Sequence, residues 1–170
     1  RLRYVTGQEI TSVQAQFATR SGEAIDVEDI ASLSMRLKSG AVASFHAGYI
    51  LSMSGAGYHN RGGYDPYNAF NGRLGRIYWS GATGTNRLFV ESTHPDWATA
   101  PQRIFDYTLA ESASYGGVYG EWFVSDFVRA AQSGSTPLAS GYDALQVARV
   151  VDAAYESDRT GQRIAVTEET

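Results

Sequence analysis

The chain of 170 residues is 43% hydrophobic and 19% charged, which is the composition of one globular domain with a substantial core. Its formal net charge of -4 is mild and both signs are interspersed, which argues against nucleic acid or an anionic membrane as a partner. The absence of cysteine excludes disulfides, thiolate metal sites and cysteine nucleophiles, and it favours a reducing compartment, the cytoplasm. No apolar run approaches the ~20 residues that span a bilayer.

The chain starts at Arg1, and its first residues have the pattern of a helix that is ending. Leu2, Tyr4 and Val5 lead directly into Thr6-Gly7, and glycine is the usual stop of a helix. We therefore expect the chain to continue a longer protein.

Alternation of apolar and polar residues predicts three strands in the first third of the chain. They cover residues 9–19, 31–37 and 41–50, and the turn Lys38-Ser39-Gly40 joins the last two as a hairpin. The polar residues Asp26 to Asp29, which precede the second strand, are read as a turn with solvated carboxylates. The predicted apolar face, expected to lie under helices, consists of Val13, Ala15, Phe17, Leu33, Met35, Phe45 and Tyr49.

The opposite face of these strands is small and polar. Because a face of this kind need not be covered by the chain's own helices, we expect it to form a polar contact in a homo-oligomer. Its residues are Ser32, Ser34, Arg36, Ser44 and His46.

The segment from Ser52 to Tyr67 is a long loop rich in glycine and aromatic residues, and long loops of this kind often carry function. It leaves a well-predicted strand whose end can position it beside a small-molecule substrate. The candidate substrate contacts in this loop are Tyr58, His59, Arg61 and Tyr64. Two further candidates lie later in the chain, Trp97 and Tyr115.

Further strands are expected at residues 73–79, 87–91 and 103–109, and two helices follow. Phe123, Phe127 and Ala131 recur at helical spacing up to a stop at Ser133-Gly134.

The second helix has Ser140 as N-cap, Asp143 as capping partner and Gly161 as stop, and a short strand at residues 163–166 ends the chain. Its predicted core stripe consists of Leu145, Ala148, Val151 and Tyr155. Strands first and helices last predict an α+β fold: an open mixed, mostly antiparallel β-sheet with helices packed on one face.

No self-sufficient active site is evident. The histidines His46, His59 and His94 lack metal-ligand spacing, and there is no nucleophile elbow. Gly55-Ala56-Gly57 begins a dinucleotide fingerprint, but Asn60 stands where its last glycine should be and no helix pattern follows. We therefore assign no catalytic, cofactor-binding or metal-binding residue.

The segment from Ser140 to Val166, SGYDALQVARVVDAAYESDRTGQRIAV, resembles the closing helix and strand of the Gfo/Idh/MocA oxidoreductases, the glucose-fructose oxidoreductase and inositol dehydrogenase family. The upstream order is also similar to that family. It runs through the strand at Glu9 to Ala15, then Val27 to Ala31, the hairpin at Leu37 to Ala43, the stretch Gly72 to Trp79, and Asp126-Phe127.

The resemblance implies that residues 1–170 form a single C-terminal domain for substrate binding and oligomerisation. The N-terminal Rossmann domain, which would bind NAD or NADP, is absent from this chain. The family's Glu-Lys-Pro and Gly-x-His-x-x-Asp motifs would stand upstream of Arg1, so the resemblance supplies no catalytic residue. The intact enzyme is expected to transfer hydride to or from a sugar, a polyol or a related hydroxyl or carbonyl compound. The chain alone is expected to be inactive and to bind no cofactor.

Two alternatives remain open at this point. One is an NAD-dependent redox elimination that cleaves a glycosidic bond on the same scaffold, and the other is a non-catalytic assembly module. NAD that never dissociates during turnover would favour the first. A coding sequence that begins near Arg1 would favour the second.

Overall fold

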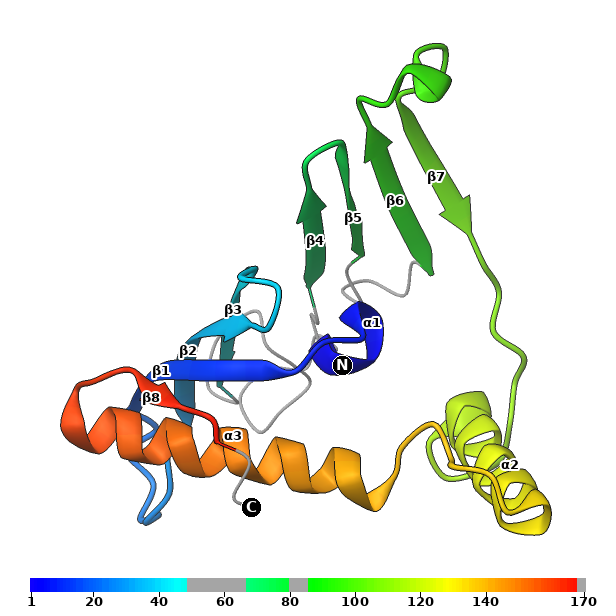
Figure 1. The fold of residues 1–170 in the computed structure, drawn as a ribbon. Helices are drawn as coiled ribbons and strands as arrows, with labels where there is room; N and C mark the ends of the chain where they lie inside the picture. Colours follow the sequence, from blue (N-terminus) through cyan, green and yellow to red (C-terminus); the bar gives the residue numbers. More distant parts are fainter. Residues whose placement is uncertain (49–66, 80–85, 168–170) are drawn as a thin grey trace. The chain divides into compact units, whose positions relative to one another are not determined.

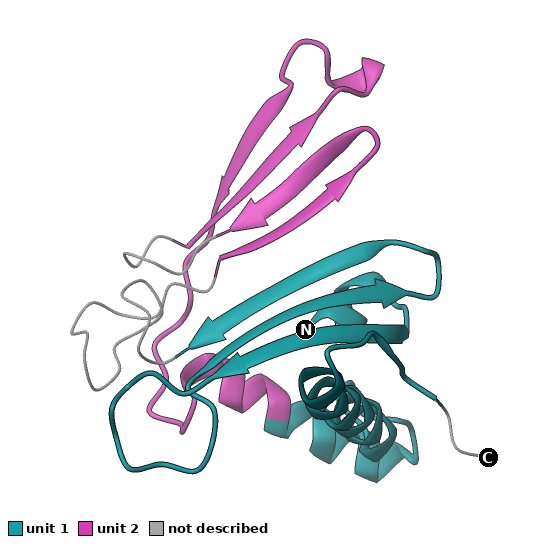
Figure 2. Cartoon of the chain, turned by 90° about the vertical axis from the view of Figure 1, so that its left-hand side faces the viewer, with its two compact units in different colours: residues 1–48, 124–170 teal, residues 49–123 magenta. Residues whose placement is uncertain are grey.

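A computed structural model describes residues 1–48, 67–79 and 86–167. The chain divides into two compact units, one made of residues 1–48 and 124–170 and the other of residues 49–123 (Figure 2). The helix α2 (Gly117–Ser133) begins in the second unit and ends in the first. No helix among the described residues is long and apolar enough to cross a membrane.

The first unit is built on a four-stranded sheet in which every pairing is antiparallel. The helix α3 (Gly141–Thr160) runs along this sheet and packs against β1 and β8 (Figure 1). The strand order is β3 (Val42–Gly48), β2 (Ile30–Leu37), β1 (Ile10–Ala18) and β8 (Ile164–Ala165). The three strands and the hairpin turn predicted from alternation are confirmed, and Gly40 in the turn has a φ of 89°.

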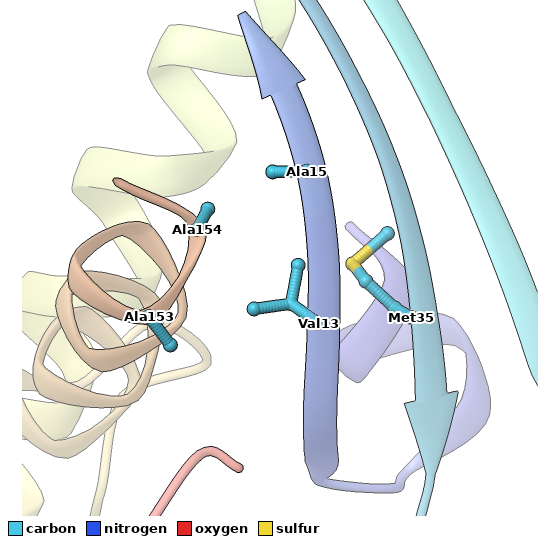
Figure 3. Close-up of a cluster of buried hydrophobic side chains, with 5 residues drawn as sticks. All are labelled: Val13, Ala15, Met35, Ala153 and Ala154. Atoms are coloured by element: carbon cyan, nitrogen blue, oxygen red, sulfur yellow. The ribbon is translucent and has the colours of Figure 1, made fainter. Parts of the chain in front are cut away.

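Three of the five residues in the core cluster of this unit are alanines. Alanines from α3 meet the apolar face of β1 and β2, and Leu33 packs against the edge of the cluster, as predicted. Phe45 lies on the outer strand and is 49% exposed, and Tyr49 lies outside the described residues. The core cluster consists of Val13, Ala15, Met35, Ala153 and Ala154 (Figure 3).

The predicted core stripe of α3 is wrong. Its four residues, Leu145, Ala148, Val151 and Tyr155, are all exposed. The buried residues of the helix are Gln146, Ala153, Ala154 and Ser157. Small side chains let a helix axis come close to a sheet, so the most buried face is the one with alanine and serine. Of the apolar residues, Val150 packs against this core, while Leu145, Val151 and Tyr155 lie on exposed faces. The large-residue periodicity therefore marked the wrong face.

Tyr155 is a case of this error, since it was assigned to the core but is 47% exposed. Its hydroxyl donates to the carboxylate of Glu28 at 2.8 Å, and its ring meets the ring of Phe17 edge to face at 5.0 Å. The bond to Glu28 raises the pKa of Tyr155. This tyrosine joins α3 to the loop before β2.

The predicted helix ends are confirmed. Ser140 and Asp143 form a capping box at the start of α3, and Gly161 ends the helix with a φ of 68°. The short helix α1 (Leu2–Thr6) ends at Gly7, which is also left-handed.

Asp29 is not solvated, contrary to the prediction, but is only 3% exposed. Its Oδ2 atom accepts hydrogen bonds from the backbone N–H groups of Arg20 and Ser21, at 2.7 and 2.6 Å. Burial alone would raise the pKa of Asp29, but the bonds from Ser21 and Arg20 outweigh it and lower the pKa. The carboxylate therefore organises the loop between β1 and β2.

The second unit is a four-stranded antiparallel meander, with strands in chain order (Figure 1). Its strands are β4 (Asn68–Gly72), β5 (Gly75–Trp79), β6 (Arg87–Ser92) and β7 (Gln102–Asp106), and the 3₁₀ helix η2 (Pro95–Trp97) lies between the last two. The predicted strand at 73–79 begins at Gly75, because residues 73 and 74 form the turn. β4 was not predicted. The α+β class with open antiparallel sheets is confirmed, and the described strands form two such sheets.

Candidate functional site

Four of the six predicted substrate contacts, Tyr58, His59, Arg61 and Tyr64, lie outside the described residues. They therefore remain predictions. The other two, Trp97 and Tyr115, are both in the second unit, and no contact joins them in the described part of the chain.

Trp97 is partly buried at the end of η2, and its ring is occupied by a neighbour. The guanidinium of Arg103 on β7 lies 3.8 Å from the ring centroid, which is close cation–π contact. His94 is the N-cap of η2, where its Nδ1 atom accepts from the backbone N–H of Asp96 at 3.3 Å. These contacts fix the β6–β7 connection and do not by themselves form a catalytic arrangement.

Tyr115 is fully exposed just before α2, and its backbone lies against the first turn of the helix. A Cβ atom on Gly120 would lie 2.0 Å from the carbonyl oxygen of Tyr115, so only glycine fits there. The neighbouring Tyr119 meets Trp122 edge to face at 5.5 Å. Burial, and then the electrostatic interaction and hydrogen bond with Tyr107, raise the pKa of Tyr119. The segment from Tyr115 to Tyr119 is an alternative place for the site on sequence grounds, whereas its partners Trp122 and Tyr107 could not be identified from the sequence.

The polar face predicted for assembly is exposed over the three long strands of the first unit. Registers place its side chains in rows, with Ser34 between Gln14 and Ser44, and Ser32 opposite His46. Arg36 donates to the carbonyl oxygen of Gly40 at 3.1 Å, which holds its charge at the hairpin end. Most of the side chains on this face are therefore small and uncharged.

The strongest electrostatic feature of the first unit is a three-residue cluster at Arg3. Its guanidinium donates to both carboxylate oxygens of Glu9 at 2.7 Å and to Oδ1 of Asp143 at 2.6 Å. Its side chain is 14% exposed, and the bonds to Glu9 raise its pKa. Hydrogen bonds from Ser140, followed by the bond from Arg3, lower the pKa of Asp143 to about 2. The cluster ties α1, the start of β1 and the start of α3 together and is structural.

Among the described residues, no three histidine, aspartate or glutamate side chains gather closely enough to hold a metal ion.

Comparisons with known proteins show which proteins the chain is similar to. Residues 1–61 match the sequence family described as the GFO/IDH/MocA C-terminal domain. No curated protein matches the chain.

Solved oxidoreductases have the same fold over nearly the whole chain. A levoglucosan dehydrogenase in complex with NADH is 24% identical, with a TM-score of 0.79, and the match covers 98% of this chain and 47% of that one. An oxidoreductase domain protein from Kribbella flavida is 22% identical, with a TM-score of 0.79 and coverage of 98% and 47%. An oxidoreductase from Agrobacterium radiobacter in complex with NAD+, L-tartaric acid and magnesium is 21% identical, with a TM-score of 0.73 and coverage of 96% and 45%.

The chain therefore spans less than half the length of these solved proteins. The resemblance to the Gfo/Idh/MocA C-terminal domain is confirmed in sequence over residues 1–61, and nearly the whole chain shares its fold with part of solved oxidoreductases.

Proposed function

We propose that this chain is the substrate-binding and oligomerisation domain of an NAD(P)-dependent oxidoreductase. The intact enzyme transfers hydride between the nicotinamide and a carbon that bears a hydroxyl or carbonyl group, in a sugar, a polyol or a related compound. The observation that carries the proposal is the fold shared with levoglucosan dehydrogenase, whose solved complexes contain NADH and levoglucosan. In this proposal the cofactor is held by a Rossmann domain outside these 170 residues.

In the proposed enzyme, the Rossmann domain binds the cofactor and this chain forms part of the substrate site. The loop that contains Tyr58, His59, Arg61 and Tyr64 follows β3 in the chain and combines aromatic faces with hydrogen-bonding groups, which suits a molecule with C–H patches and hydroxyls. Trp97 is a weaker candidate because Arg103 occupies its ring. Tyr115 keeps its side chain free for a contact.

The polar face of the first unit mediates self-association in this proposal. Its serines are exposed and lie in rows, and they carry no charge. Two copies can therefore approach at these serines without burying unpaired ions.

The proposed activity is tested on the full-length protein with NAD and NADP against a panel of sugars and polyols, by the absorbance of the reduced nicotinamide. Reduction of either cofactor with at least one polyhydroxylated substrate is expected. A matched preparation of the 170-residue chain should bind neither cofactor in calorimetric titration. Full-length protein that binds no nicotinamide, or a chain that binds it saturably on its own, would overturn the assignment.

A further inference from the structure

A groove of about 660 Å³ lies on the second unit, at the end of its sheet where β4 turns into β5. Its floor is a polar row that crosses all four strands in register, Asn71, Arg76, Glu91 and Gln102. Its rim includes Arg73, in the turn between β4 and β5, and the hydroxyl residues Ser92 and Thr93. A volume of this size suits a small organic molecule.

The carboxylate of Glu91 is already saturated with donors. Both of its oxygens bond to Arg76, at 2.7 and 3.0 Å, and Oε1 also accepts from Gln102 at 3.1 Å and from the hydroxyl of Tyr78 at 3.4 Å. The bonds from Arg76 lower the pKa of Glu91, so it remains an anion whose charge is compensated. It has little capacity left to accept a hydrogen bond from a ligand.

The groove therefore presents spare donors and one uncompensated positive charge. Arg73 is exposed and has no ion-pair or hydrogen-bond partner among the described residues, and the Nη1 group of Arg76 is also unused there. Two guanidinium groups and one carboxylate leave the lining with one positive charge. Ser92 and Thr93 both donate their hydroxyl protons to the carbonyl oxygen of Leu74, and the Ser92 oxygen also accepts from the backbone N–H of His94. The hydroxyl oxygen of Thr93 keeps lone pairs that can accept from a ligand.

We propose that this groove binds a small hydroxylated organic acid. Its carboxylate pairs with Arg73 and the free side of Arg76, and its hydroxyls bond to Asn71, Thr93 and the amide oxygen of Gln102. A guanidinium matches a carboxylate with two parallel N–H groups, which gives this pairing its preference over a neutral polyol. This proposal does not rest on the proposed dehydrogenase activity, because a ligand can bind to these residues in the absence of nicotinamide.

The test is calorimetric titration of the chain, without cofactor, with D-gluconate, its neutral counterpart D-glucitol, acetate and inorganic phosphate. We expect saturable binding of gluconate that is at least about tenfold tighter than that of glucitol, which lacks the charge-assisted contact, and also tighter than that of acetate and phosphate, which lack the hydroxyl contacts. Glucitol that binds as tightly as gluconate would overturn the role of the carboxylate. Acetate or phosphate that binds as tightly would overturn the assignment to a hydroxylated acid.

Two arginine variants locate the site. Arg73→Gln is expected to weaken gluconate binding about tenfold, as one charge-assisted contact is lost. Arg87→Gln is the matched control, because Arg87 pairs with Asp106 at 2.6 Å at the opposite end of the same sheet. The affinity of this variant for gluconate should equal that of the original chain. Thermal melting of both variants checks that they fold. Equal gluconate affinity in folded Arg73→Gln and the original chain would overturn the proposal.

Discussion

The hydroxyl oxygen of Ser157 on α3 accepts a hydrogen bond at 3.0 Å from the backbone N–H of Ala15 on β1. Asp158 does the same for the backbone N–H of Phe17, at 2.8 Å. The strand β8 pairs with β1 only as far as Val13, so the helix side chains take over the hydrogen bonds where the strand stops. Ser157 also donates to the carbonyl oxygen of Gln162, beyond the end of the helix.

Ser157→Ala should destabilise the chain by about 2 kcal/mol. The residue is fully buried, and its loss leaves the N–H of Ala15 and the carbonyl of Gln162 without a partner. Urea denaturation measures the change. Ser133→Ala is the control, because the Ser133 hydroxyl bonds to carbonyls of its own helix at an exposed position, and it should change stability by under about 0.5 kcal/mol. Equal effects of the two substitutions would contradict the role given to Ser157.

Gly75→Ala should disrupt the second sheet. A Cβ atom at Gly75 would lie 2.1 Å from the carbonyl oxygen of Glu91, so β5 and β6 would have to separate. We expect a loss of about 2 kcal/mol or more, comparable with overpacking of a core. Gly72→Ala, in the same hairpin, is the matched control, because its Cβ would make only an ordinary contact at 3.7 Å. Urea denaturation of both variants measures the loss in the free energy of unfolding. A loss in Gly72→Ala as large as that in Gly75→Ala, or larger, would contradict the prediction.

The capping box makes stability depend on acid pH. The folded pKa of Asp143 is about 2, below its ordinary value of 3.8, because the ionised form is bonded by Ser140 and then by Arg3. A lowered folded pKa gives stability that is present above the ordinary value and is lost as the pH falls toward the folded one. Between about pH 4 and pH 2, Asp143→Asn should therefore lose less stability than the original chain. Asp152→Asn, an exposed carboxylate of the same helix, is the control. The measurement is the denaturant midpoint of each protein across this pH range. Midpoints that fall equally in Asp143→Asn and in the original chain would contradict the role given to Asp143.

The proposed assembly surface predicts that Ser34→Arg weakens self-association. Ser34 is in the middle of the polar face, and a two-fold contact there would bring two new positive charges together. Sedimentation of the full-length protein should show about tenfold weaker association or more. Ser39→Arg adds the same charge in the exposed turn next to β3, off the face, and should leave association unchanged. A monomeric original protein at high concentration would exclude the surface altogether.

The proposed substrate loop is tested by kinetics. Tyr64→Ala or His59→Ala in the full-length enzyme should lower kcat/KM without a change in the melting temperature. Phe45→Ala, on β3 before these residues, is a comparison that should leave kcat/KM unchanged. If both loop variants keep the original kcat/KM, the site moves toward Tyr115 and the start of α2.

Local patterns predicted the elements well, because their causes are local. Alternation located β1, β2 and β3, and the caps at Ser140 and Gly161 fixed both ends of α3. The strand β4 was missed because Asn-Ala-Phe-Asn-Gly has a single large apolar residue, and its pairing with β5 stabilises it instead.

Features that depend on distant partners could not be predicted from the sequence. The burial of Asp29 follows from backbone groups eight and nine residues earlier, at Ser21 and Arg20. The buried face of α3 depends on how closely the helix approaches β1. The groove residues belong to four strands, and only the strand register brings Asn71 and Gln102 into one row.

The alanine-rich contact between α3 and β1 has a consequence for how this chain can vary. Ala154 is 1% exposed and Val13 is completely buried, so at this point the two layers meet through short side chains. At such a contact, replacing an alanine by glycine removes only one methyl group, whereas replacing it by a larger residue forces the helix away from the sheet. Enlarging substitutions should therefore be more harmful here than shortening ones. The positions least tolerant of change are thus the smallest residues, and drift among homologues should be confined to the large apolar side chains on the outer faces of α3.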